Sequence, residues 1–262
     1  MLISSLKSST RSSLLAAKIQ KGSDGVSPVA FFTMVTYRLP PRLAIIAGLI
    51  PCNARLVDVG TDHGLLPIRL LQENRIQSAI ATDIRPGPLD RGKSNAILHG
   101  VENISFRLCN GLDGVDAHEA DTVVIAGMGG ENIVDILQRA PWCSDNVRLI
   151  LQPMSRPEVL RYALKELRLR ILSETLVEDS GRLYSVIVAE GGEAEVYSPA
   201  ELYTGLFRHV QSQALFGRLL DEQNARLTPA VNGLMRSGKA EDIPRLEELK
   251  AALSGIQSAE RG

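Results

Sequence analysis

From residue 39 onward the chain shows an amphipathic segment to residue 50 and then alternates short apolar runs with segments of helical pattern. The apolar runs have the length of buried strands, and the helical segments supply the crossovers that parallel strands need. Such an order is typical of βαβ units around a parallel sheet. Strands are predicted at residues 55–59, 78–83, 104–108, 121–126 and 147–151, and helices at residues 65–73, 89–99, 132–139 and 157–167.

The pattern changes after the fifth strand. Two more strand-like runs, residues 169–177 and 183–190, flank the turn-forming cluster Glu178, Asp179, Ser180 and Gly181. Runs of this kind around such a turn predict a β-hairpin. The predicted fold class is therefore α/β, with a doubly wound Rossmann-like sheet that has an antiparallel strand at one edge.

The C-terminal part of the chain has helical periodicity. Residues 191–200 are typical of a linker, and residues 202–227 have helical composition with an irregular apolar stripe. Beyond residue 240, apolar side chains recur at spacings of three and four, which predicts a second helix, and the two helices are expected to join around residues 232–239. They would form an antiparallel, coiled-coil-like pair. The members of the second apolar stripe are Ile243, Leu246, Leu249, Leu253 and Ile256.

The first 33 residues are rich in serine and have four basic side chains against one acid, without a sustained helix or strand pattern. Segments of this kind are typically disordered. An organellar transit peptide is less favoured because the apolar and basic spacing is poor, and Met34 offers another start. The predicted organisation is a disordered extension at 1–33, a Rossmann-like domain at 34–191 and a helical domain at 201–262.

Composition and charge bear on whether the protein is membrane-bound, disulfide-rich, metal-binding or nucleic-acid-binding. No apolar run approaches the roughly 20 residues of a membrane-spanning helix, so a soluble protein without a membrane partner is expected. Three widely spaced cysteines favour neither a disulfide framework nor a metal site, which fits a reducing cytoplasm. The formal net charge of −1 argues mildly against a nucleic-acid partner. Residues 161–170 form a local basic run, for which a solvated helix face leading into a strand is the favoured interpretation.

The strongest chemical signal is the strand-to-turn segment at residues 56–64, LVDVGTDHG. A doubly wound sheet binds its nucleotide at such a turn, where Gly60 lets a cofactor approach the backbone. The G-x-G-x-x-G spacing of a pyrophosphate-binding dehydrogenase is absent. A phosphate-free adenosine cofactor, S-adenosyl-L-methionine, fits better, and Asp58 could accept its ammonium group. By themselves these residues also suit an ordinary strand-to-helix turn.

Polar side chains at two further strand ends reduce that ambiguity. Asp83 ends the second predicted strand, where an acid hydrogen-bonds ribose hydroxyls, and Asn110 follows the third, within reach of an adenine amino group. The fourth strand runs into the glycine-rich loop at residues 127–130, and the fifth into Gln152. These two loops are expected to border the acceptor, with Gln152 able to read a base edge. At least one glycine of the loop at residues 127–130 is expected to adopt a positive φ angle.

Taken together, the motifs DVGTDHGLLP, IAGMGG, LILQP and SVIVAE, in this order, strongly resemble the bacterial tRNA (adenine(22)-N1)-methyltransferases, over residues 39–191. The resemblance implies S-adenosyl-L-methionine as cofactor, tRNA as partner and transfer to N1 of an adenine. It implies a cofactor site formed by Asp58, Gly60, Asp62, His63, Asp83, Asn110 and Gly111, to which the strand-end pattern adds Gly127. The C-terminal helices are similar to that family's coiled-coil domain.

For catalysis we expect Asp62, His63 and Gln152 to act. N1 of adenine already has an in-plane lone pair, so alignment matters more than a base, and the Asp62 carboxylate would stabilise the cationic product. His63 could relay a proton, although a histidine that satisfies the turn's own backbone is the favoured interpretation. Aromatic residues are few, and Tyr37 and Tyr184 are possible stacking partners for a base.

The sequence departs from the family pattern at two positions. The family usually has aspartate at position 110 and Q-P-N where this chain has Gln152, Pro153 and Met154. The second change removes a polar group beside the acceptor. A methyltransferase for another RNA base and a catalytically inert RNA-binding relative therefore remain as alternatives, and a nicotinamide-dependent oxidoreductase is disfavoured by the missing dinucleotide turn.

Overall fold

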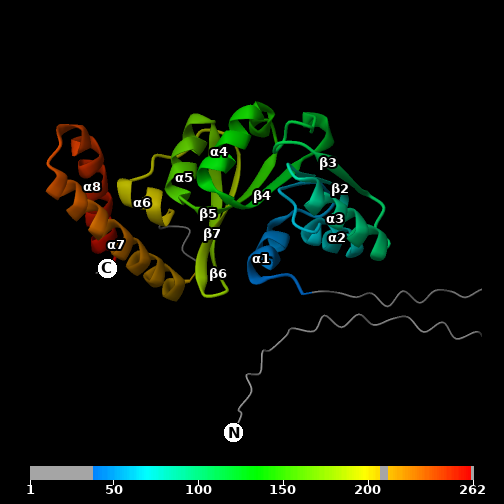
Figure 1. Ribbon diagram of the computed structural model, residues 1–262, viewed down its shortest axis with the longest axis horizontal. Coiled ribbons are helices and arrows are strands. Elements are labelled where there is room, and N and C mark those ends of the chain that lie inside the picture. The colour runs from blue at the N-terminus through cyan, green and yellow to red at the C-terminus, as the bar shows by residue number, and fades with distance from the viewer. Residues whose placement is uncertain (1–37, 207–211, 261–262) are drawn as a thin grey trace, which may run out of the picture. The chain divides into compact units, whose positions relative to one another are not determined.

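A seven-stranded mixed sheet runs through the computed structural model, which describes residues 38–206 and 212–260 (Figure 1). The strand order is β3-β2-β1-β4-β5-β7-β6, and β1 to β5 are parallel. The expected extension at residues 1–33 lies outside the described residues. The strands are β1 (Ala54–Val59), β2 (Ile76–Asp83), β3 (Ile104–Leu108), β4 (Thr122–Gly129), β5 (Arg148–Ser155), β6 (Leu169–Asp179) and β7 (Arg182–Gly191).

All five parallel strands and the closing hairpin are confirmed, as is the predicted fold class. Strand β7 pairs antiparallel to both β5 and β6, so it lies between them and β6 forms the outer edge. Glu178 and Asp179 belong to β6, and the turn itself is formed by Ser180 and Gly181, both with positive φ. Strands β4 and β5 extend beyond their predicted ends, into the two loops expected to border an acceptor.

Helices cover both faces of this sheet. Side chains of α1 and α2 share one apolar core with Val124 of β4, whereas α4 and α5 share another with Val123 and Ile125. The alternation follows from the strand period of two, which sends successive side chains to opposite faces. The helices of this part are α1 (Pro41–Leu49), α2 (Leu65–Gln72), α3 (Pro86–Leu98), α4 (Gly130–Arg139) and α5 (Pro157–Glu166).

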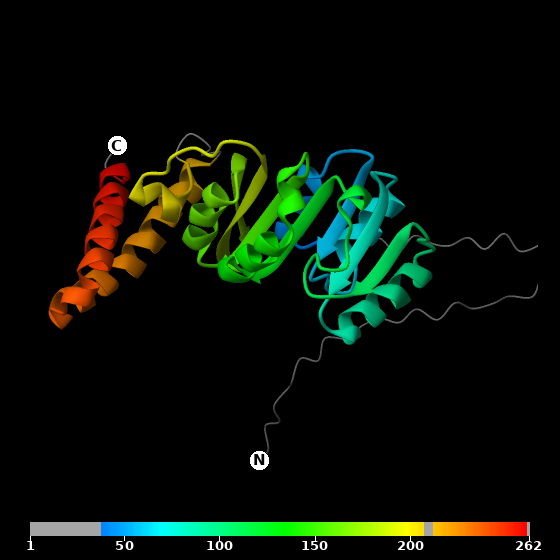
Figure 2. The same ribbon diagram turned by 90° about the horizontal axis from the view of Figure 1, so that it is seen from above.

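Three helices follow the hairpin: α6 (Pro199–Thr204), α7 (Gln213–Ser237) and α8 (Ile243–Ala259). The long helices α7 and α8 lie side by side, as Figures 1 and 2 show, and share a third apolar core. The predicted connection at residues 232–239 was wrong, because α7 continues to Ser237 with Pro229 inside it. Leu227 and Val231 keep the apolar stripe in contact with α8, and Gly238 ends the helix at a φ of 61°.

The basic run at residues 161–170 was interpreted as a solvated helix face leading into a strand, and for Arg161 this interpretation was wrong. Its side chain is fully buried rather than solvated, because it pairs with Glu174 of β6 and donates to the carbonyl of Leu202 in α6. In the part of the chain that the structure describes, no helix is long and apolar enough to cross a membrane, and no cluster of metal-binding side chains occurs.

Candidate active site

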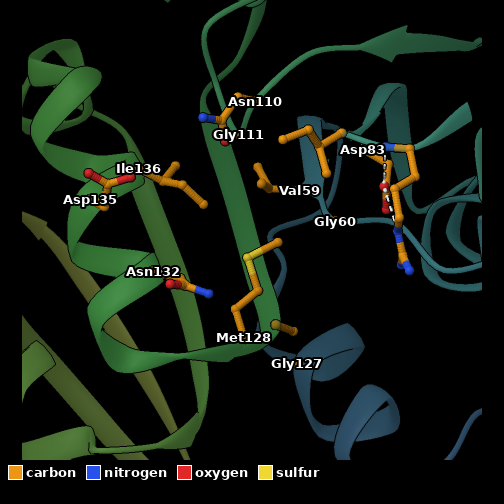
Figure 3. Close-up of a pocket in the computed structure, with 13 residues that line it drawn as sticks. Val59, Gly60, Asp83, Asn110, Gly111, Gly127, Met128, Asn132, Asp135 and Ile136 are labelled. Atoms are coloured by element: carbon orange, nitrogen blue, oxygen red, sulfur yellow. Dashed lines mark hydrogen bonds and ion pairs between the residues drawn. The ribbon is translucent and has the colours of Figure 1, made fainter.

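A cavity of about 470 Å³ lies at the carboxyl ends of β1 to β4, beside the first turns of α4 (Figure 3). Its volume is within the range of roughly 300–1,000 Å³ that is usual for small-molecule sites. Five of the predicted cofactor-binding or catalytic residues line it: Gly60, Asp83, Asn110, Gly111 and Gly127. The carboxyl ends of neighbouring parallel strands meet at one edge of the sheet, which is why residues far apart in sequence converge here.

The turn after β1 is held by the neighbouring strand. The amides of Gly60 and Thr61 both donate to the carbonyl of Thr82, at 2.8 and 3.0 Å. Gly60 has a φ of +70°, and a Cβ at this position would overlap the Cε of Met128. The positive φ favours glycine at this position, and the end of the flexible Met128 side chain occupies the space beside it.

Asp58 is not among the residues that line the cavity. Its side chain is buried and its Oδ2 accepts a hydrogen bond of 2.6 Å from Thr61 Oγ1. Burial raises the pKa of Asp58 to about 6, and the Thr61 hydrogen bond partly opposes that rise. In this structure the carboxyl group stabilises the turn, and its contact with a cofactor ammonium group stays a prediction.

Asp83 and Asn110 are brought together on the cavity wall, as the sequence predicts. Asp83 is 7% exposed at the end of β2, and its Oδ1 accepts a hydrogen bond of 2.8 Å from the backbone amide of Arg85. Asn110 follows β3, and Gly111 beside it has a φ of +64°. A Cβ on Gly111 would lie 2.7 Å from Cγ1 of Ile136, so α4 can approach this loop only because the residue is glycine.

Asp62 and His63 are outside the set of residues that line this cavity. The Asp62 side chain is 78% exposed, and its Oδ1 lies 3.1 Å from Nε2 of His63. His63 has a φ of 59°, an uncommon conformation for a residue with a Cβ, and Asn95 holds it by donating to its carbonyl at 2.8 Å. The two side chains thus contact each other on the partly exposed surface of the turn after β1.

Gln152 is fully buried. Its Nε2 donates to the carbonyl of Pro153 at 3.1 Å and lies 3.6 Å from Sδ of Met154, while its Oε1 accepts from Arg42 at 3.5 Å. These contacts hold the end of β5 against α1. A direct role in reading a base stays a prediction.

The glycine-rich loop expected at residues 127–130 forms the end of β4 and the start of α4, and it combines two requirements. Gly127 has a φ of +81°, which confirms that one loop glycine serves a positive φ angle. A Cβ on Gly130 would overlap the carbonyl oxygen of Arg156, so the start of α4 packs directly on the residue that joins β5 to α5.

The sequence interpretation missed the part of the wall that α4 supplies. Asn132, Asp135 and Ile136 line the cavity from one face of this helix, as Figure 3 shows. Their spacing of three and four residues was a usable signal, because it places side chains on one helix face. Ile84 and Arg85, which follow β2, were also missed.

The lining residues fit an adenosine compound better than a dinucleotide. Two carboxylates, Asp83 and Asp135, face the cavity against one guanidinium, Arg85, so the wall does not favour a pyrophosphate. A carboxylate at a strand end suits ribose hydroxyls. Glycines at positions 60, 111 and 127 leave backbone accessible around it.

Comparisons with known proteins agree with this geometry. The model of the family described as "Methyltransferase domain" matches residues 39–187. The tRNA (adenine(22)-N(1))-methyltransferase of Bacillus subtilis is 34% identical over 172 residues, which cover 64% of this chain and 72% of that protein.

Two crystal structures are similar over most of the chain. One, of the Bacillus subtilis tRNA methyltransferase specific for adenosine 22, is 27% identical with a TM-score of 0.77, covering 85% of this chain and 99% of the other. The second, of a Streptococcus pneumoniae protein named as a candidate enzyme of the same type and holding S-adenosyl-L-methionine, is 31% identical with a TM-score of 0.69, covering 81% and 98%. The motifs, the fold and these similarities establish that the chain belongs to the tRNA (adenine(22)-N(1))-methyltransferase family.

Proposed function

We propose that this protein transfers the methyl group of S-adenosyl-L-methionine to N1 of adenosine 22 in tRNA, a reaction of the cytoplasm. The observation that carries the proposal is the convergence of Gly60, Asp83 and Asn110 on one cavity at the strand ends. The Bacillus subtilis relative is named for this activity, and the Streptococcus pneumoniae structure was determined with this cofactor.

The chain's residues hold the cofactor in distinct ways. The buried Asp83 carboxylate would accept hydrogen bonds from the ribose hydroxyls, and Asn110 and Gly111, which line the same cavity, would flank the adenine. Gly60 and Gly127 keep side chains away from the centre of the cavity. When bound, S-adenosyl-L-methionine supplies an electrophilic methyl group on a sulfonium centre.

Catalysis needs alignment more than proton removal, because N1 of adenine has a free lone pair in the ring plane. Near-attack geometry can contribute up to roughly 7–11 kcal/mol. Since N1 is on the pairing edge, the base must be unpaired before the carboxyl ends of β4 and β5 can enclose it. Asp62 stabilises the positive charge that develops on the purine, and His63 orients that carboxylate through the contact between their side chains.

Gln152 belongs to the acceptor side of this proposal as a positioning residue. Through its contacts with Arg42 and Met154 it fixes the end of β5 beside the glycine-rich loop. Met154 itself is 40% exposed and occupies the place of the family's usual asparagine, so it offers the substrate an apolar contact.

The C-terminal helices are proposed to bind tRNA without contacting the cofactor, since the cofactor cavity is lined by no residue beyond 136 in the part of the chain that the structure describes. Their charge gives limited support, because residues 201–262 contain eight acids and eight Lys or Arg residues. Several of these cations also have acidic partners in the described residues: Arg218 with Glu178 and Glu222, Arg226 with Glu158, and Arg245 with Glu248. Packing of α7 on α8 is the competing explanation of this part.

The test is direct. Purified protein is incubated with S-adenosyl-L-methionine and with two tRNA transcripts, one with adenosine and one with guanosine at position 22, and the digested nucleosides are analysed by mass spectrometry. We expect 1-methyladenosine from the first transcript only. Methylation of both transcripts, or of another base, would move the assignment to a different RNA position, and no methylation would refute the proposal.

A further inference from the structure

The wall that α4 gives to the cofactor cavity contains a polar side chain that the proposed function does not use. Of the polar side chains in the lining, three take part in ion pairs, and a fourth, Asn110, flanks the cofactor adenine in the proposed function. The remaining one is Asn132, whose side-chain amide forms no hydrogen bond with another residue that the structure describes. The ion-paired side chains are Asp83 and Arg85, which pair with each other, and Asp135, which pairs with Arg139.

Asn132 lies at the end of the cavity that borders the carboxyl ends of β4 and β5. Helix α4 begins at Gly130, directly after β4, and Gly130 packs on the carbonyl oxygen of Arg156 between β5 and α5. One helical turn after Asn132, Ile136 packs on Gly111, which flanks the adenine in the proposed function. A turn of helix advances by roughly 5–6 Å, so Asn132 is displaced by about that much from the adenine toward the acceptor side.

The amide of Asn132 is accessible to a ligand. The residue is exposed, and in Figure 3 its side chain points away from α4 in the direction of Met128. Gly127, on the same wall, is also exposed and has no side chain to cover this part of the cavity. A planar base that enters beside the cofactor can therefore reach both the oxygen and the nitrogen of this amide.

We propose that Asn132 recognises the adenine that is methylated, with Oδ1 accepting from the 6-amino group and Nδ2 donating to N7. Asparagine amides pair with these two atoms of adenine in nucleic-acid recognition generally. This pairing leaves N1 and its lone pair free for the methyl group. It also disfavours guanine, because O6 and N7 of guanine are both acceptors and O6 would oppose Oδ1. The inference rests on the proposed function, because it takes this cavity as the methyl-transfer site.

The contact with the 6-amino group strengthens during the reaction. N1 uses its lone pair to bond to the methyl carbon as the bond from that carbon to sulfur breaks, so sulfur keeps the electron pair of the broken bond and positive charge moves to the purine. The 6-amino group of a charged ring donates a charge-assisted hydrogen bond, which is stronger than a neutral one. Asn132 should therefore contribute to kcat as well as to KM.

Steady-state methylation of two tRNAs tests the inference, one with adenosine and one with 7-deazaadenosine at position 22. The 7-deaza base keeps N1 and the 6-amino group and has a C–H group in place of N7. Asn132→Ala should lower kcat/KM for adenosine by roughly 5- to 150-fold, the usual range for one bidentate pair between an amide and a base. The loss for 7-deazaadenosine should be smaller, because only one of the two hydrogen bonds can form with that base.

Asn132→Asp gives a second readout, because aspartate has the same shape. Its carboxylate still accepts from the 6-amino group but repels the lone pair of N7, so the ratio of kcat/KM for 7-deazaadenosine to that for adenosine should rise above the wild-type ratio. The matched control is Gln138→Ala, an exposed amide of α4 outside the cavity lining, which should treat both tRNAs as the wild type does. S-adenosylhomocysteine should bind the wild type, Asn132→Ala and the control with equal Kd.

An Asn132→Ala protein with the wild-type kcat/KM for adenosine, or with equal losses on the two tRNAs, would overturn the inference. A raised Kd for S-adenosylhomocysteine in this variant would also overturn it, and would assign Asn132 to the cofactor. Alanine is the residue that a helix favours most, so the variant should fold. Wild-type protein that forms no 1-methyladenosine would instead refute the proposed function itself.

Discussion

Nη2 of Arg161 lies 2.8 Å from Oε2 of Glu174, and both side chains are buried. Arg161 also donates to the Leu202 carbonyl at 2.8 Å, and Glu174 accepts from the backbone amide of Leu206 at 3.4 Å. The ion pair therefore joins α5, β6 and the segment that leads to the long C-terminal helices. Removing one partner of such a pair leaves a buried charge without compensation.

Glu174→Gln should consequently lower the free energy of unfolding by about 3–5 kcal/mol. The control is Glu190→Gln, which breaks the exposed Arg170–Glu190 pair of the same hairpin and should cost below about 1 kcal/mol. Urea denaturation of both variants measures the difference. Equal losses would mean that the buried pair has no special role in holding these elements together.

Asp83→Ala should weaken S-adenosyl-L-methionine binding, because ribose hydroxyls would lose a charged acceptor worth roughly 1.5–3 kcal/mol. Calorimetric titration gives the affinity, and Asp90→Ala on the outer face of α3 is the control, since Asp90 is exposed and pairs only locally with Lys93. Unchanged affinity in a folded Asp83→Ala protein would exclude this residue from the cofactor site.

Asp58 should make the stability of the cofactor-free protein depend on pH. Its folded-state pKa of about 6 lies above the ordinary aspartate value of 3.8, so the folded protein holds this proton more tightly than the unfolded chain does. The raised pKa of Asp58 therefore contributes stability that is fully present below about pH 4. This stability is lost as the pH rises to about 6, which lowers the free energy of unfolding by up to about 3 kcal/mol. Denaturation of the wild type and of Asp58→Asn across this range isolates the effect.

Cofactor binding should respond in the opposite direction, because an ammonium group favours the ionised carboxylate. Affinity for S-adenosyl-L-methionine should rise over the same pH interval in the wild type and stay flat in Asp58→Asn. A flat profile in the wild type would restrict Asp58 to its hydrogen bond with Thr61.

Arg236 offers a test of the C-terminal helices in tRNA binding. Its Nε donates to the carbonyl of Asn232 rather than to an acid, so its charge remains available to a phosphate. Arg236→Gln should weaken tRNA binding and reduce the salt slope by about 1, with S-adenosyl-L-methionine affinity unchanged. The control is Lys250→Gln, which removes the same net charge from a lysine that pairs with Glu247. It should leave the salt dependence of tRNA affinity closer to that of the wild type.

The alternation of apolar runs with helical segments was enough to predict the sheet, and β3 was predicted with the bounds that it has. The end of α7 was not predictable in this way. Asn232 and Gly233 are typical of turns, but the contacts of Val231 and Leu234 with α8 continue the helix past them. Those contacts join residues distant in the sequence, so local propensity cannot report them.

In the candidate site, the positions of Asp83 and Asn110 at one edge of the sheet were predictable, because the strand topology alone decides which strand ends meet. The orientation of a side chain at a strand end depends on the local register, and one residue of shift reverses the face. This is why the side chain of Asp58 is buried although its position in the strand was predicted, whereas Gln152 was expected in a loop and is instead a buried residue of β5. The burial of Arg161 depends on acceptors in β6 and α6, which the basic run does not reveal.

The insertion of β7 beside β5 has a consequence for synthesis of the chain. Residues of β5 leave the ribosome before the hairpin that supplies their partners: Leu149 pairs with Ala189, Ile150 with Val188 and Leu151 with Ile187. Until then β5 has an open apolar edge, a template for wrong pairing with other chains. A nascent chain thus passes through an aggregation-prone interval, and translation that stops before the hairpin is complete leaves that edge open permanently.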